Sequence, residues 1–127
     1  MKYIVQTQKS VDRAAEDLQQ AVAAHGFGVL HIHDLHQTLA KKGFTLAGEC
    51  RILEVCNPQQ AMNVLQEDMD MNLVLPCRIS VYDDHGTTKI GMVRPTALLS
   101  ALSDSPKLMD VAEEVEQKSI AMIEDAR

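Results

Sequence analysis

The chain has 127 residues, 46% of them hydrophobic, which is enough for one ordinary domain to bury a core without disulfides or metals. Its net charge of −6 leaves no basic cluster for nucleic-acid phosphates, since Lys41-Lys42 is the only basic pair. No apolar run approaches the roughly 18 residues of a membrane-spanning helix, and the segment after Met1 turns polar too early for a signal peptide. We therefore expect one soluble, cytoplasmic domain over residues 1–127 that contacts neither nucleic acid nor membrane.

The chain opens with a strand signal and a helix signal. Weak alternation predicts a strand at residues 2–7. Ser10 is a preferred N-cap, and apolar residues at helical spacing predict a helix over residues 11–25. Gly26 ends this helix because a left-handed stop favours glycine.

A second strand and helix follow directly. Alternation over residues 27–33 predicts a strand with His31 and His33 on one face. A capping-box pattern, with lysines and a glycine at the far end, predicts a short helix over residues 34–42.

The third strand leads into a well-marked helix start. Residues 49–55 alternate, with Leu53 and Val55 on one face. Asn57 is a preferred N-cap and Pro58 suits the first helical position, so a helix begins directly after Cys56.

Residues 73–82 predict a fourth strand, in which Pro76 marks either the start or an edge position. Turn residues at 83–86 join it to a fifth strand at residues 88–92, and the two strands form a hairpin.

Two more helical segments end the chain. Pro95 opens a short helical turn, and Ser105-Pro106 caps a long terminal helix with a buried apolar stripe. The other faces of this helix carry charged residues that we expect to be solvated: Glu113, Glu114, Glu116 and Lys118.

Together these elements predict an α+β domain. The sheet is expected to be twisted and mainly antiparallel, with four or five strands and with helices largely on one face, in the order β-α-β-α-β-α-β-β-α. Because an open sheet has edge strands that need cover, we also expect a homodimer.

Three short segments follow one another along the chain: Gly26-Phe27-Gly28-Val29-Leu30, Val55-Cys56-Asn57-Pro58 and Leu75-Pro76-Cys77-Arg78. With these segments in this order, the chain resembles the domain of unknown function 302 family over nearly its whole length. The resemblance implies a small bacterial or archaeal α+β domain, similar in topology to one half of the TATA-binding-protein fold and often a dimer. It implies no established activity. Arg78 stands where the family often has asparagine, and His31 and His36 are additional histidines.

Cysteines are the main candidates for chemistry. Cys56 lies just outside a predicted helix N-terminus, whose dipole favours a thiolate, and Cys77 lies near it if their strands are neighbours. The alternative is that both are small buried hydrophobes, as free cysteines usually are. Cys50 has no motif around it and is expected to be structural. Asn57 and Arg78 are candidate binding residues beside the two thiols.

A soft metal ion is a further hypothesis. Imidazoles of His31 and His33 with the thiols of Cys56 and Cys77 have the ligand chemistry of zinc or copper. Surface histidines with no ligand role are the alternative.

The sequence supports three classes of function. The first is a small-ligand or metal-binding module with a pocket near the residue 55–58 and 75–78 signatures. The second is a thiol-dependent enzyme or sulfur-handling protein that uses Cys56 with Cys77. The third is a structural or partner-binding homodimer. Hydrolase and nucleotide chemistry have no supporting motif.

Overall fold

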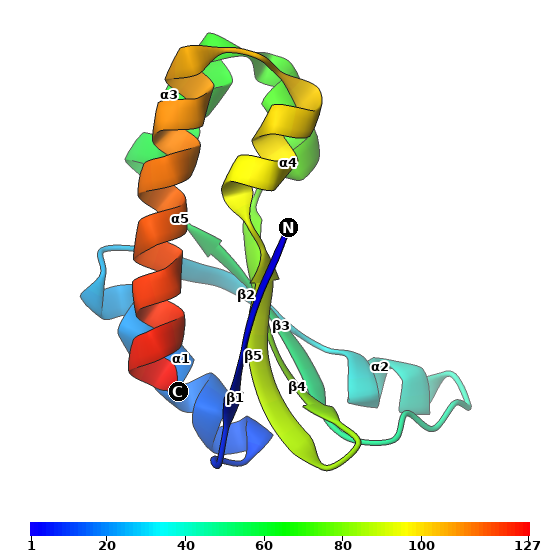
Figure 1. Cartoon of the computed structure of the whole chain (residues 1–127). Helices are drawn as coiled ribbons and strands as arrows, with labels where there is room; N and C mark the ends of the chain where they lie inside the picture. The colour runs from blue at the N-terminus through cyan, green and yellow to red at the C-terminus, as the bar shows by residue number, and fades with distance from the viewer.

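The computed structural model describes all 127 residues as a five-stranded sheet with helices on one face and a group of helices at one end (Figure 1). The strands are β1 (Lys2–Thr7), β2 (Gly28–Asp34), β3 (Cys50–Cys56), β4 (Cys77–Asp84) and β5 (Thr87–Val93). The helices are α1 (Val11–Ala24), α2 (Leu35–Lys41), α3 (Pro58–Glu67), α4 (Pro95–Leu102) and α5 (Pro106–Ala126), with a 3-10 helix η1 (Met69–Val74) after α3.

The sheet has the order β1-β5-β4-β3-β2, and every neighbouring pair is antiparallel. The α+β class and the antiparallel sheet are therefore confirmed. The observed order of elements differs from the predicted one mainly by the separate helix α4, which the sequence indicated only as a helical turn.

The main core lies between the sheet and the pair α1 and α5. Alternation along the strands directs one side chain in two toward these helices. Leu53 and Val55 share a face, as predicted, and that face is the buried one. The fully buried large side chains of this core come from both layers: Leu18, Val22, Leu53, Val55, Ile79, Val81, Ile90, Met122 and Ile123. Each contributes about 1.5–3 kcal/mol of hydrophobic stabilisation.

A second, smaller core lies beyond one end of the sheet. It consists of Val64, Met71, Leu99, Leu108 and Ala112, which come from α3, η1, α4 and the first half of α5. We call this part of the molecule, residues 57–76 and 95–114, the helical lobe; it stands at the top of Figure 1. Because α5 is 21 residues long, it contributes to both cores and joins them.

The helical lobe corrects the predicted start of the fourth strand. Residues 73–76 were expected to be strand, but β4 begins at Cys77 and the preceding residues belong to η1 and its connection. The Asp68 side chain accepts a hydrogen bond from the Asp70 backbone N–H at 3.0 Å, and Met71 is buried in the lobe. Tertiary packing thus overrides local strand propensity here. Pro76 precedes β4 as predicted for a strand start, whereas its edge alternative is wrong, because β4 is an interior strand.

Helix ends follow their sequence signals closely. The side chains of Ser10, Asp34, Asn57 and Ser105 each accept a hydrogen bond from the backbone N–H three residues later. α1 ends one residue earlier than predicted, at Ala24. Gly26 then has φ +79°, and the backbone N–H groups of Gly26 and Phe27 close the helix onto the carbonyls of Ala23 and Val22.

The hairpin of β4 and β5 is confirmed. Its two-residue turn has φ 52° at His85 and 91° at Gly86, which matches the left-handed pair of a type I′ turn.

Glu116 is the clearest departure from the predicted surface of α5. We expected it to be solvated, but it is only 7% exposed. Its Oε1 accepts hydrogen bonds from the backbone N–H and the hydroxyl of Thr96, at 3.1 and 2.7 Å, and Arg94 Nη1 lies 3.5 Å from its Oε2. Arg94 itself provides no side-chain cap for α4. The Glu116 carboxylate therefore caps α4 from a different helix, where a negative charge meets the positive end of the helix dipole.

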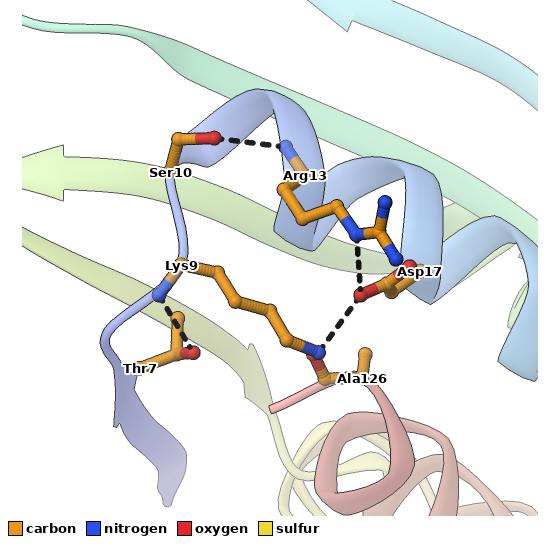
Figure 2. Close-up of polar contacts among 6 residues, drawn as sticks. All are labelled: Thr7, Lys9, Ser10, Arg13, Asp17 and Ala126. Atoms are coloured by element: carbon orange, nitrogen blue, oxygen red, sulfur yellow. Dashed lines mark hydrogen bonds and ion pairs between the residues drawn. The ribbon is translucent and has the colours of Figure 1, made fainter.

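A polar clasp joins the two ends of the chain (Figure 2). Lys9 Nζ donates to the carbonyl of Ala126, at the end of α5, and lies 2.8 Å from Asp17 Oδ2 on α1. Arg13 Nε lies 3.3 Å from the same carboxylate oxygen. A cation at the C-terminal end of a helix is favoured by the helix dipole, so this clasp holds α5 against α1.

The clasp gives a pH-dependent prediction. The hydrogen bond from Lys9, aided by Arg13, lowers the pKa of Asp17 below its ordinary value of 3.8. At pH values between the lowered folded-state pKa and 3.8, Asp17 binds more protons in the unfolded chain than in the folded one. The stabilisation is therefore complete above pH 3.8 and is lost as pH falls through the folded-state pKa. Urea unfolding should show a smaller loss of stability between pH 5 and pH 2.5 in Asp17→Asn than in the wild type. Glu16→Gln, which removes an exposed carboxylate outside the clasp, should retain the wild-type slope, whereas equal slopes in all three proteins would contradict the clasp.

Candidate ligand-binding cavity

A cavity of about 260 Å³ lies between the two cores, where the helical lobe meets the sheet. Twelve of its 17 lining residues are hydrophobic. They come mainly from β3, β4, α3, α4 and α5, with Phe27 before β2 and Leu75 before β4. Phe27 and Val55 line it from the main core, and Val64, Leu99 and Ala112 line it from the second core. The cavity therefore arises because two separately packed clusters meet.

The pairing of β3 with β4 brings the two sequence signatures together at this cavity. Val55 pairs with Cys77, so the end of β3 and the start of β4 lie side by side. Cys56, Asn57 and Cys77 all line the cavity. The condition that we set for the two thiols to be close, that their strands are neighbours, is confirmed.

Three carboxamides provide the polar part of the lining: Asn57, Gln60 and Asn72. Asn57 is committed to the fold, because its Oδ1 accepts the hydrogen bond that caps α3. Asn72 donates to the carbonyl of Met69 at 2.7 Å, which leaves its side-chain oxygen as an acceptor. Gln60 and Asn72 were missed by the sequence analysis, because no spacing pattern links an α3 residue with one in η1.

The thiol of Cys77 is electrically neutral at physiological pH. Burial, and to a lesser extent the nearby Cys56, raises the pKa of Cys77 to about 11. The lining of the cavity thus consists of hydrocarbon, thiol and carboxamide groups. A site of this composition favours an uncharged, mainly apolar ligand over an ion.

Arg78, the other candidate binding residue, lies outside this cavity. It pairs with Glu54 of β3, one position after Cys77, and therefore points to the opposite face of the sheet. It lines a second groove of about 410 Å³, together with Leu73 and Val93.

His31 and His33 share a face of β2, as predicted. Their rings are in edge-to-face contact with centroids 4.4 Å apart, and His33 Nε2 lies 2.7 Å from Glu54 Oε2. Glu54 was not recognised from the sequence, because this contact depends on the β2–β3 register, which contains an irregularity beside Leu30. His36 is on α2, where its Nδ1 lies 3.0 Å from the carbonyl of Gly48.

The proposed metal ligands therefore form two separate pairs, the histidines on β2 and the thiols at the cavity. No group of three or more His, Cys, Asp or Glu side chains is arranged to hold a metal ion.

Cys50 lies at the other end of β3 from Cys56 and is paired with Tyr82. Burial, together with the charge of Asp34, raises the pKa of Cys50.

The fold and the cavity define a small α+β domain built from one antiparallel sheet and a helical lobe. The chain belongs to the family described as Domain of unknown function DUF302, which it matches over residues 3–126. A crystal structure of an uncharacterized conserved DUF302 protein from Bacillus stearothermophilus is 36% identical to it, with a TM-score of 0.94 over 99% of this chain and 98% of that chain. No curated protein matches, and no helix is long and apolar enough to cross a membrane.

The state of Cys77 gives a second prediction. Because only the thiolate is alkylated, the rate at Cys77 should stay low at pH 7–8 and rise toward an apparent pKa of about 11. Iodoacetamide labelling across a pH series, with mass mapping of Cys77, measures this. In Cys56→Ser the pKa of Cys77 should fall, because one of the two causes of the shift is removed. A profile in the folded protein that matches the urea-unfolded chain would contradict the prediction.

Proposed function

We propose that this protein is a binding module for a small, uncharged and mainly apolar molecule that occupies the cavity between the helical lobe and the sheet. The observation that carries the proposal is the lining: 12 of 17 residues are hydrophobic, and no side chain of the lining carries a formal charge when Cys56 and Cys77 are protonated. Burial of apolar ligand surface contributes about 25 cal/mol per Å², before the cost of association.

The carboxamides supply direction for such a ligand. Asn72 offers a free acceptor oxygen, and Gln60 projects a second carboxamide from the first turn of α3. A few placed polar groups in an apolar cavity are the usual arrangement for a specific small-molecule site. A ligand with one donor group and a compact hydrocarbon body fits this description.

A volume-filling variant tests the cavity. Ala61 lines it from α3 and is only partly exposed, so Ala61→Phe should occupy part of the space. We expect the wild type to bind the neutral dye N-phenyl-1-naphthylamine with a rise in fluorescence, and Ala61→Phe to bind it at least tenfold more weakly.

The matched control is Ala101→Phe, which makes the same substitution at an exposed position of α4 outside the cavity lining. Its dye affinity should equal that of the wild type. Thermal unfolding of both variants checks that each is folded. If the wild type does not bind the dye, or if both variants bind it as the wild type does, the cavity proposal is wrong.

A thiol-dependent enzyme or sulfur-handling protein is the second candidate. It is favoured by one observation, that Cys56 and Cys77 line the same cavity. Because the raised pKa of Cys77 opposes thiolate formation, Cys56 would be the nucleophile and Cys77 its partner. The labelling series described above also tests this candidate: Cys56 must react faster than in an unfolded control. A repeat with chelator tests the metal form of the hypothesis, for which two thiols supply only half of a tetrahedral ligand set.

We also infer that two copies associate. The strands β1 and β2 are the free edges of the sheet, and edges of this kind are usually covered. Light scattering at micromolar concentration should give twice the monomer mass of 14.0 kDa, and a mass of one chain would overturn the inference of a dimer.

The three free cysteines suit a reducing compartment such as the cytoplasm.

A further inference from the structure

Residues 35–48 form an arm that leaves the body of the protein. The arm consists of α2 and the loop that follows it, and no residue of α2 is buried. Figure 1 shows α2 standing clear of the sheet. The arm precedes β3 and the helical lobe follows it, so the two lie at opposite ends of this strand.

The arm is ordered even though it packs on little of its own chain. Asp34 caps the start of α2 through the Gln37 backbone N–H, at 3.0 Å. At the other end the backbone N–H of Phe44 donates to the carbonyl of Leu39 at 2.9 Å, with Gly43 at φ +88° between them. A seven-residue helix is not stable by itself, so these local hydrogen bonds hold the arm in one shape.

This shape presents one aromatic ring and two positive charges. Phe44 is 66% exposed, and it is one of only two phenylalanines in the chain. Lys41 and Lys42 lie directly before it, and residues 35–48 contain no aspartate or glutamate, so the arm has a formal charge of +2. A preformed aromatic group beside cations has the composition of an interface anchor.

The helical lobe has the opposite character. Its residues include seven carboxylates and one lysine, which gives a formal charge of −6. It also exposes four large hydrophobic side chains: Met62, Met69, Leu73 and Leu102. Leu73 is 76% exposed and borders the groove of about 410 Å³ that Val93 and Leu98 also line. Methionine-rich surfaces of this kind adapt readily to an inserted ring.

We propose that the arm of one copy docks on the helical lobe of a second copy, with Phe44 packed at the groove beside Leu73 and with Lys41 and Lys42 facing the acidic residues of the lobe. This inference rests on the homodimer proposed above and specifies its interface. Because arm and lobe lie at opposite ends of β3, two copies placed side by side in opposite directions make both contacts at once. Such an exchange has two-fold symmetry, as most dimer interfaces do.

The first test removes the aromatic anchor. The dissociation constant of the dimer, measured by sedimentation at several concentrations, should rise at least tenfold in Phe44→Ser. Phe44→Tyr is the matched control, because it keeps an aromatic ring at the same exposed position and should leave the dissociation constant near the wild-type value. Circular dichroism checks that each variant is folded. A wild-type dimer that Phe44→Ser leaves intact would preserve the homodimer and overturn the docking of the arm.

The second test reverses the charges on each side. The variant Lys41→Glu with Lys42→Glu places acid against acid, and Asp70→Lys with Asp104→Lys places base against base, so each protein alone should be mainly monomeric. An equimolar mixture should form a heterodimer, because both of its contacts then join opposite charges. Gln19→Glu with Gln20→Glu and Lys118→Glu, which changes the net charge as much as the double lysine variant but outside arm, lobe and edge strands, should remain a dimer. Folded variants that fail to recover on mixing would overturn the proposal, as would a monomeric wild type.

Discussion

The pairing of β3 with β4 is the constraint on which the candidate site depends. The register that places Val55 opposite Cys77 sets the end of one strand beside the start of the next. Everything between them in the sequence, α3 and η1, must then leave the sheet at the same end and return to it. The Asn57 cap directs α3 away from the strand, and Met71 buries η1 against α4 and α5. This register therefore places the α3 and η1 half of the helical lobe, and the part of the cavity lining that these elements supply, over the end of the sheet.

The long helix α5 keeps the lobe in place over the sheet. Its first half supplies Leu108 and Ala112 to the lobe, and its second half supplies Met122 and Ile123 to the main core. Glu116 lies between these halves and caps α4 through Thr96. A buried carboxylate that lost its partners would cost about 1–3 kcal/mol or more, so the contact stabilises the packing of the start of α4 against α5. Both helices line the cavity between the two cores.

Local signals in the sequence were sufficient for most of the fold. The caps at Ser10, Asn57 and Ser105, the glycine stop at Gly26 and the turn before β5 act over a few residues, and all were predicted. Errors occurred where distant contacts decide the outcome. Residues 73–76 were predicted as strand, but they end η1 and connect it to β4, because the burial of Met71 against α4 and α5 holds this segment in the helical lobe. Glu116 was taken for a surface residue because its partner Thr96 lies twenty positions away.

The candidate site was predictable only in part, for the same reason. Cys56, Asn57 and Cys77 were found because each stands at a strand end or a helix start, positions that the chain marks locally. Gln60 and Asn72 reach the cavity from separate elements and carry no such mark. Arg78 was assigned to the site by its proximity in sequence to Cys77, but alternation along β4 sends it to the other face of the sheet.

The distribution of charge bears on which ligand the cavity can accept. The helical lobe has a formal charge of −6, and the chain as a whole has the same value. This negative field lowers the local concentration of anions near the cavity mouth. Inside, the raised pKa of Cys77 keeps its thiol neutral, and the remaining polar groups are carboxamides. An anion would thus meet repulsion outside and no counter-charge within, whereas a neutral molecule meets neither obstacle. The exterior and the lining therefore both support the neutral ligand that we propose.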